Sequence, residues 1–121
     1  MNRTFDFLKE HRITVVKISG HYNFAQGEAL LSEASLKIKA TDSRGSLWDF
    51  RDAEVTGRLV TLYERPELYQ KIGLLRSVKK AVLLNELNEE WNFLETVCFN
   101  RGWNVRLFTD YMHSIDWLVK N

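Results

Sequence analysis

The first twenty residues alternate between apolar and polar positions in a pattern that predicts a β-hairpin. In the segment 4–8, Phe5 and Phe7 fall on one face of a strand, because successive side chains of a strand point to opposite faces. After four polar residues, the β-branched run 13–18 predicts a second strand, which Gly20 ends. A connection this short favours antiparallel pairing of the two strands.

The spacing of apolar residues becomes helical after the hairpin. Asn23 is a candidate N-cap with Gln26 as its capping-box partner, and apolar residues recur at helical spacing from Leu30 to Ile38. Turn-forming residues occupy positions 40–45. We therefore expect one amphipathic helix between the hairpin and this turn.

Three short apolar runs, at 46–50, 81–84 and 104–108, predict the remaining strands. Runs of this length suit strands that are buried on both faces of a parallel sheet. Helical patterns separate the runs, and this alternation predicts right-handed βαβ units and a mainly parallel sheet. The sequence thus predicts an α/β fold, and the lack of a linker or internal repeat predicts one domain over 1–121.

The last two predicted helices have capping residues and apolar stripes. Asn85 or Asn88 is the candidate N-cap of the first of them, and Thr109 or Asp110 is that of the second. Apolar residues at helical spacing form one core stripe on each helix. These are Leu87, Trp91, Leu94 and Cys98 on the first helix, and Ile115, Leu118 and Val119 on the second.

Residues 58–77 also have a helical pattern, but Pro66 divides them into expected pieces at 58–64 and 66–77. The stretch is amphipathic with basic flanks, which is typical of a segment that lies on a membrane surface or covers an apolar pocket. The competing interpretation is an ordinary helix packed on the sheet. A ligand-binding role would use Leu59, Leu62, Tyr63, Tyr69 and Ile72.

The composition of the chain argues against several classes of function and of site. With 17 Lys+Arg against 16 Asp+Glu, the net charge of +1 argues against nucleic-acid binding by bulk charge. The single cysteine, Cys98, excludes an internal disulfide and a cysteine metal site, and its place on a core stripe predicts an unreactive thiol. Residues 1–12 lack the apolar region of a secretory signal, so a cytoplasmic location is expected. We expect neither a metal nor a cofactor.

Acidic side chains gather where the predicted strands end, which is where ligands bind in open α/β sheets. Asp49 and Asp52 flank Arg51 at the end of the strand 46–50, and a polar loop is expected over 51–57. One hypothesis is an enzyme whose two carboxylates hold Mg²⁺ or accept a phosphoryl group. The favoured interpretation is structural, with Arg51 paired to a neighbouring carboxylate and Asp52 capping the loop. No HExxH, GxGxxG or GxSxG motif supports an enzyme.

Three motifs together resemble the small SpoIIAA-like proteins of the STAS and SEC14-like group. WDFRDA at 48–53, KAVL at 80–83 and VRLFTD leading to IDWL at 105–118 match that group's lWDfRdA, kxAvv and vrvFxDxxxAxxWL patterns in the same order. The resemblance spans nearly the whole chain and implies a (βα)n superhelix, a sheet flanked by helices. It also implies a non-enzymatic binding or regulatory module with a protein partner. The alternative it implies is a small carrier of apolar ligands, or a peripheral membrane protein, that uses 58–77 as a gate.

The same resemblance implies a position for regulation. In anti-anti-sigma factors of this group, a serine in a DSSGL loop after the central strand is phosphorylated by a partner kinase. Thr56 lies near that serine's position, although Glu54 and Val55 replace the Asp-Ser before it, and the competing interpretation is that Thr56 caps the following helix. The candidate regulatory loop comprises Asp49, Arg51, Asp52 and Thr56.

Charge patterning adds two expectations about contacts. The even mixture of charges, together with aromatic residues on a small domain, predicts a C2 homodimer. Acids gather at strand ends whereas bases flank 58–77, so contact with a membrane or an acidic partner is expected to use that local patch.

Overall fold

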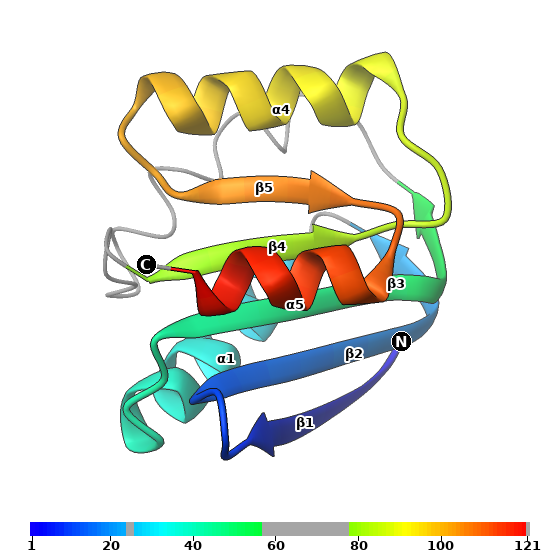
Figure 1. Ribbon diagram of the computed structural model, residues 1–121. Helices are drawn as coiled ribbons and strands as arrows, with labels where there is room; N and C mark the ends of the chain where they lie inside the picture. The colour runs from blue at the N-terminus through cyan, green and yellow to red at the C-terminus, as the bar shows by residue number, and fades with distance from the viewer. Residues whose placement is uncertain (24–25, 57–77, 121) are drawn as a thin grey trace.

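The computed structural model describes residues 1–23, 26–56 and 78–120, which form one five-stranded sheet and three helices (Figure 1). The strands are β1 (Asn2–Leu8), β2 (Ile13–Asn23), β3 (Gly45–Thr56), β4 (Lys79–Leu83) and β5 (Val105–Phe108). The helices are α1 (Gly27–Ala40), α4 (Glu89–Asn100) and α5 (Tyr111–Val119). The helical pieces expected at 58–64 and 66–77 lie outside the described residues.

The strands follow one another across the sheet in the order of the sequence, β1-β2-β3-β4-β5. β1 and β2 pair antiparallel, whereas the pairs β2–β3, β3–β4 and β4–β5 are parallel. The predicted hairpin and the predicted mainly parallel α/β sheet are both confirmed. β3 lies at the centre, and its adjacent residues Leu47 and Trp48 are 0% and 1% exposed. The first half of this strand is therefore buried on both faces, as its apolar run indicated.

The helices cover opposite faces of the sheet and create two separate cores. Figure 1 shows α5 in front of the sheet and α1 behind it. The larger core joins Leu31 of α1 and Leu94 of α4 to Trp48. The smaller core joins Leu118 of α5 to Leu47. Because side chains alternate along a strand, β3 supplies neighbouring residues to both cores and connects the two layers of helices.

Cys98 is buried in the larger core, as its position on the stripe predicted. Burial raises the pKa of its thiol to about 11, so the thiol is protonated at neutral pH. A nucleophilic cysteine needs a thiolate with access to solvent. The predicted place of Cys98 in the core is confirmed, and its burial supports the prediction of an unreactive thiol.

The polar loop expected over 51–57 is wrong for residues 51–56, which continue β3. This half of β3 pairs with the end of β2, which runs past Gly20 to Asn23. Gly20 pairs with Ala53 inside the ladder, and its φ of +78° is a conformation that glycine adopts without strain, so the strand passes through it rather than ending there. The overlooked signal is the alternation of Ala53 and Val55, which face the larger core, with exposed acids.

The structure selects among the predicted helix caps. Asn88 begins α4 by accepting the Trp91 N–H at 2.9 Å, and Asp110 begins α5 by accepting the His113 N–H at 3.0 Å. The prediction of Asn23 as the N-cap of the first helix is wrong, because Gln26 occupies that position. The predicted partners still meet, since the Asn23 N–H donates to Gln26 Oε1 at 3.3 Å.

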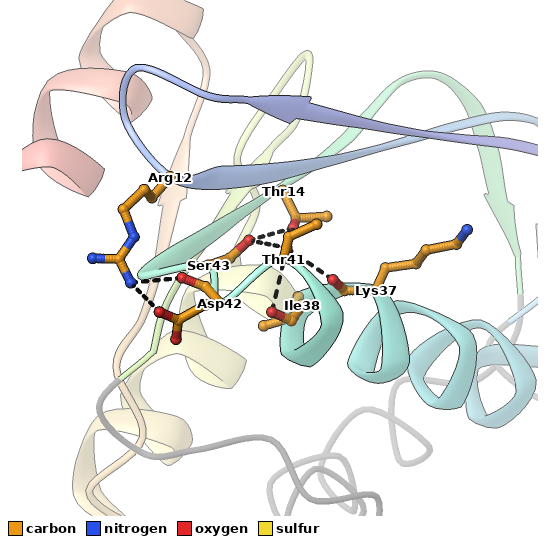
Figure 2. Close-up of polar contacts among 7 residues, drawn as sticks. All are labelled: Arg12, Thr14, Lys37, Ile38, Thr41, Asp42 and Ser43. Atoms are coloured by element: carbon orange, nitrogen blue, oxygen red, sulfur yellow. Dashed lines mark hydrogen bonds and ion pairs between the residues drawn. The ribbon is translucent and has the colours of Figure 1, made fainter.

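Three hydroxyl groups fasten the end of α1 to the strands, as Figure 2 shows. Ser43 Oγ lies 2.6 Å from Thr14 Oγ1 and 2.7 Å from Thr41 Oγ1. The Thr41 hydroxyl also donates to the Lys37 carbonyl oxygen at 2.8 Å, in the last turn of the helix. Buried hydroxyl groups are retained where they satisfy one another, so this cluster fixes the angle at which the chain enters β3.

A second contact in Figure 2 ties together two residues with left-handed backbone conformation. Arg12 has φ +56° and Asp42 has φ +51°. The Arg12 guanidinium donates to the carbonyl oxygen of Asp42 at 2.8 Å and to its carboxylate at 2.7 Å. The turn before β2 and the turn before β3 therefore hold each other in conformations that cost free energy in isolation.

Candidate functional site

The buried carboxylate of Asp49 and the guanidinium of Arg51 form the centre of the site, on β3 at the level where the neighbouring strand β4 ends. Arg51 Nε donates to Asp49 Oδ1 and Arg51 Nη2 to Asp49 Oδ2, both at 3.0 Å. The Arg51 backbone N–H adds a third hydrogen bond to Oδ1 at 3.0 Å. Asp49 is 6% exposed, so this fork is an ion pair with one buried member.

The fork controls the ionisation of Asp49. Burial alone would raise the pKa of the Asp49 carboxyl, but hydrogen bonds from the Arg51 side chain and backbone and the charges of Arg51 and Lys17 outweigh it. The net pKa of Asp49 is below its usual value. The pKa of Arg51 is raised, first by its hydrogen bonds to Asp49. Both groups are therefore charged at neutral pH.

Two further contacts cross from β2 to β3 beside the fork, an ion pair and a histidine–carboxylate contact. Lys17 Nζ lies 3.2 Å from Asp52 Oδ2, and His21 Nδ1 lies 3.3 Å from Glu54 Oε2. All four side chains are more than half exposed. Together with Asp49 and Arg51 they form a surface of paired polar side chains with two ion pairs, which we call the paired-charge surface.

The candidate regulatory residues lie on a strand rather than a loop, with Asp49, Arg51 and Asp52 in its middle and Thr56 at its end. Arg51 pairs with a neighbouring carboxylate as predicted, whereas the prediction that Asp52 caps a loop is wrong, because Asp52 lies in β3 and pairs with Lys17. Thr56 is exposed at the end of β3, and its hydroxyl donates to the Tyr22 carbonyl oxygen at 3.4 Å.

The candidate ligand-binding residues are not placed by the structure. They are Leu59, Leu62, Tyr63, Tyr69 and Ile72, and they lie outside the described residues. The apolar-ligand gate therefore stays a prediction.

Two further observations concern metal binding and membrane spanning. Within 1–23, 26–56 and 78–120, no three histidine, cysteine, aspartate or glutamate side chains are grouped closely enough to hold a metal ion. No helix in the same ranges has the length and apolar character needed to span a bilayer.

Comparison with known proteins finds solved structures that are similar to this chain. No protein-family model matches the chain, and no curated protein sequence matches it. An anti-sigma factor antagonist from Mycobacterium paratuberculosis superposes with a TM-score of 0.64, at 14% identity, over 98% of this chain and 94% of that one. An uncharacterised protein from Shewanella loihica with a SpoIIAA-like fold gives 0.58, at 18% identity, over 97% and 92% of the two chains. The chain has the SpoIIAA-like fold. Unphosphorylated SpoIIAA itself, an anti-sigma factor antagonist, gives 0.52 at 12% identity over 97% of both chains.

The SpoIIAA-like fold brings to the site residues that the sequence analysis did not single out for it. Lys17 reaches Asp52 because β2 and β3 pair in a register with an irregularity after Lys17. Asn85 follows β4, and its Nδ2 donates to the Arg51 carbonyl oxygen at 2.7 Å. The ring of Tyr111, at the start of α5, lies 5.9 Å from the Arg51 guanidinium. Only Asn85 had a signal, because it follows a predicted strand.

Proposed function

We propose that this chain is a regulatory module that binds a protein partner, that it forms one domain over 1–121, and that it docks through the paired-charge surface. The observation that supports this most is the pairing itself. On this surface of β2 and β3, Asp49 and Asp52 each have an opposite charge within 3.2 Å, and Glu54 lies 3.3 Å from His21. Such a surface offers a partner a fixed pattern of charges, which gives an interface specificity and orientation.

The same pairing argues against an enzyme that uses Asp49 and Asp52. A catalytic carboxylate must have an oxygen free to reach substrate, a metal ion or a proton. The charge of Asp49 is neutralised by Arg51, and that of Asp52 by Lys17. The two carboxylates therefore contact different cations and share no common substrate position.

The fold adds a second line of support. Similar solved structures include anti-sigma factor antagonists, one of them SpoIIAA in both an unphosphorylated and a phosphorylated form. A fold alone does not define a function, because one fold hosts many activities. The proposal depends on the coincidence of this fold with a charged, paired surface on β2 and β3.

Charge reversal at Asp52 tests the proposal. Asp52→Lys replaces the Lys17–Asp52 ion pair by two adjacent cations. The new side chain stays at an exposed position of β3, so the change affects the charge of the surface and not the packing of the core. Asp116→Lys, on the exposed side of α5, makes the same change of charge elsewhere. Quantitative affinity capture from lysate of the source cells is expected to yield partners that wild type and Asp116→Lys retain in equal amounts and Asp52→Lys loses. Equal capture by all three proteins would contradict the docking surface.

Thr56 is the proposed position of regulation. A phosphate there would add about two negative charges at neutral pH, two residues along the strand from Glu54 and on the same face. Thr56→Glu is therefore expected to weaken capture of the same partners, whereas Thr56→Ser keeps the hydroxyl and is expected to preserve it. Equal binding by the two variants would remove Thr56 from the mechanism.

A further inference from the structure

β1 is an edge strand that has a neighbour on one side only, β2, within the described residues. The strand has seven residues, of which five are exposed, and it pairs with β2 in a continuous register. Prolines and bulges protect an edge strand from pairing with another chain, and β1 contains neither. Alternate residues of an antiparallel strand direct their N–H and C=O groups to the same side, so alternate backbone groups of β1 point outward. These groups can form a second ladder.

The helix α1 flanks β1 on the face of the sheet that lies at the back of Figure 1. Arg3 Nε donates to Glu33 Oε2 at 2.6 Å, and Lys37 Nζ lies 5.9 Å from the centre of the Phe5 ring. Two residues of a strand advance by about 6.6 Å and four residues of a helix by about 6 Å, so the two contacts are evenly spaced along both elements. The segment from Glu33 to Lys37 therefore lies alongside the segment from Arg3 to Phe5, in the same direction.

The side of α1 next to β1 carries an acid, an apolar residue and a base, which are Glu33, Leu36 and Lys37. Residues three and four apart share one side of a helix, so these three form a stripe, which we call the α1 stripe. Leu36 is 70% exposed, and Lys37 has no carboxylate within ion-pair distance in the described part of the chain. The Glu33 side chain is 38% exposed, and its carboxylate can accept a second cation besides Arg3. The stripe is complementary to itself in reverse, because an antiparallel copy places its base beside this acid and its acid beside this base.

Symmetry limits how two copies of β1 can pair. A twofold axis perpendicular to the sheet makes the two strands antiparallel and keeps the same face of each sheet on the same side. Because side chains alternate between the faces, the axis must pass through a residue of β1 and not between two residues. Among the central residues, axes at Arg3 and Asp6 would place a charge opposite its own copy, which is destabilising. Axes at Thr4 and Phe5 avoid that cost.

The charges of α1 select the axis at Thr4. This position lies midway between Arg3 and Phe5, and hence midway along the segment from Glu33 to Lys37. An axis there places Glu33 of each copy beside Lys37 of the other copy. An axis at Phe5 would instead place the two Lys37 side chains beside each other, and like charges brought together across an interface cost free energy. The strand and the helix therefore favour the same twofold axis.

We propose that β1 and the α1 stripe form a twofold interface between two copies of this chain, with the axis at Thr4. In this register Thr4 lies opposite its own copy, Asn2 lies opposite Asp6, and Arg3 lies opposite Phe5. Threonine pairs and cation–aromatic contacts are favourable between strands, and the Asn2 amide can donate to the Asp6 carboxylate.

The interface joins the two five-stranded sheets into one continuous sheet, and the two α1 stripes meet on one face of it. The acid and the base of each stripe pair with those of the other copy, and the exposed Leu36 side chains lie between the pairs. No residue of the paired-charge surface takes part. The proposal therefore does not depend on the proposed function and leaves that surface open to another partner.

Reversal of charge on the α1 stripe tests the proposal in sedimentation equilibrium of the full chain. Lys37→Glu places two acids together, and it is expected to raise the dissociation constant of the dimer about tenfold, because the twofold axis applies the change twice. Glu33→Lys places two bases together and is expected to have a similar effect. Lys39→Glu, at an exposed position of α1 outside the stripe, is the matched control and is expected to dimerise like wild type.

Mixing the two stripe variants separates pairing across the axis from damage to the fold. A heterodimer of Lys37→Glu with Glu33→Lys again has an acid beside a base at both ends of the stripe. The equimolar mixture is therefore expected to form heterodimers, which nitrogen-15 labelling of one variant identifies in native mass spectrometry. A defect in folding would not be repaired by mixing.

Cross-linking tests the register of the two strands. Opposed Cβ atoms of antiparallel strands lie about 5 Å apart, so Thr4→Cys brings two thiols together at the axis. Oxidised glutathione is expected to convert this variant to a disulfide-linked dimer. Asp6→Cys lies opposite Asn2 and is expected to cross-link far less. The native thiol of Cys98 is buried and does not compete.

Four results would overturn the proposed interface. They are a wild-type mass of 14.3 kDa at every concentration, equal dimerisation of Lys37→Glu and Lys39→Glu, no heterodimer on mixing, and cross-linking of Asp6→Cys in preference to Thr4→Cys. The first would show that the chain does not pair with itself. The others would show that its twofold contact lies elsewhere or in another register.

Discussion

Asp49 keeps its charge in a buried position because the residue two positions later supplies both a guanidinium and a backbone N–H. Asp49 and Arg51 are two residues apart on a strand, so their side chains leave the sheet on the same face. This spacing lets the guanidinium fold back onto the carboxylate without help from another element. The pair is therefore a local property of the sequence Asp-Phe-Arg, whereas its burial depends on the rest of the sheet.

Replacement of Asp49 by asparagine tests the strength of the fork. Asp49→Asn keeps the shape but removes the charge, so Arg51 loses an ionic partner and its three hydrogen bonds to the carboxylate weaken. We expect the free energy of unfolding at pH 7 to fall by about 1–2 kcal/mol in urea denaturation. Asp52→Asn, at an exposed pair, is the control and is expected to cost less than about 0.5 kcal/mol. Equal losses in the free energy of unfolding for the two variants would show that the buried fork stabilises the chain no more than the exposed pair does.

The pH dependence of the same variant gives an independent test. The pKa of Asp49 is lower in the folded chain than in the unfolded one, so its contribution is fully present above the unfolded value. It is lost as the pH falls through the folded value, which lies below the usual 3.8. The difference in stability between wild type and Asp49→Asn is therefore expected to be constant between about pH 5 and 8 and to shrink below about pH 4. A stability difference that grows as the pH falls would contradict a lowered pKa of Asp49 in the folded chain.

At the scale of elements, the joint between α1 and β3 depends on hydroxyl groups rather than on apolar contact. Thr14, Thr41 and Ser43 come from β2, the end of α1 and the turn before β3. Ser43 contacts both of the others, so it is the central member. A serine in that position allows three elements to meet in a buried place with their polar groups satisfied.

Removal of this central hydroxyl is expected to destabilise the joint. Ser43→Ala leaves the buried Thr14 hydroxyl with a weaker partner, the Thr41 hydroxyl at 3.3 Å. We expect a loss of about 1–2 kcal/mol in the free energy of unfolding. Thr14→Val alone should cost a similar amount. The double variant should cost less than the sum of the two, because the hydroxyls act on each other. Strict additivity in this double-mutant cycle would show that the cluster does not act as a unit.

The sequence predicted elements better where their signals are local. The hairpin, the buried half of β3 and the cap at Asn88 follow from alternation, apolar runs and capping residues within a few positions. The sequence pattern predicts a loop for the second half of β3 because polar residues outnumber Ala53 and Val55 there, and only pairing with an extended β2 makes it a strand. The register between β2 and β3 also has no signal in the sequence.

The contacts of the candidate site also divide into local and long-range ones. The pairing of Arg51 with a neighbouring carboxylate was predicted, because Asp49 and Asp52 both lie within two residues of it. The contacts of Asp52 with Lys17 and of Arg51 with Asn85 join residues more than thirty positions apart, and they depend on register and strand order. The hydrogen bond from the Leu107 N–H to Glu95 Oε2 had no sequence signal, since the pattern of α4 does not distinguish this glutamate from its other acids.

At the scale of the whole molecule, the paired-charge surface lies on β2 and β3, next to the centre of the sheet (Figure 1). β3 contributes to both cores and so connects this surface to the helices on both faces of the sheet.

Self-association is the remaining prediction for the whole chain, and it bears on the paired-charge surface. A C2 homodimer is expected to give a mass twice that of the 14.3 kDa chain in sedimentation equilibrium. Asp52→Lys should retain the dimer, because the proposed function assigns that surface to another partner. A 14.3 kDa species at every concentration would contradict the dimer. A dimer lost in Asp52→Lys would place the twofold contact at the paired-charge surface, where a second copy would compete directly with the partner.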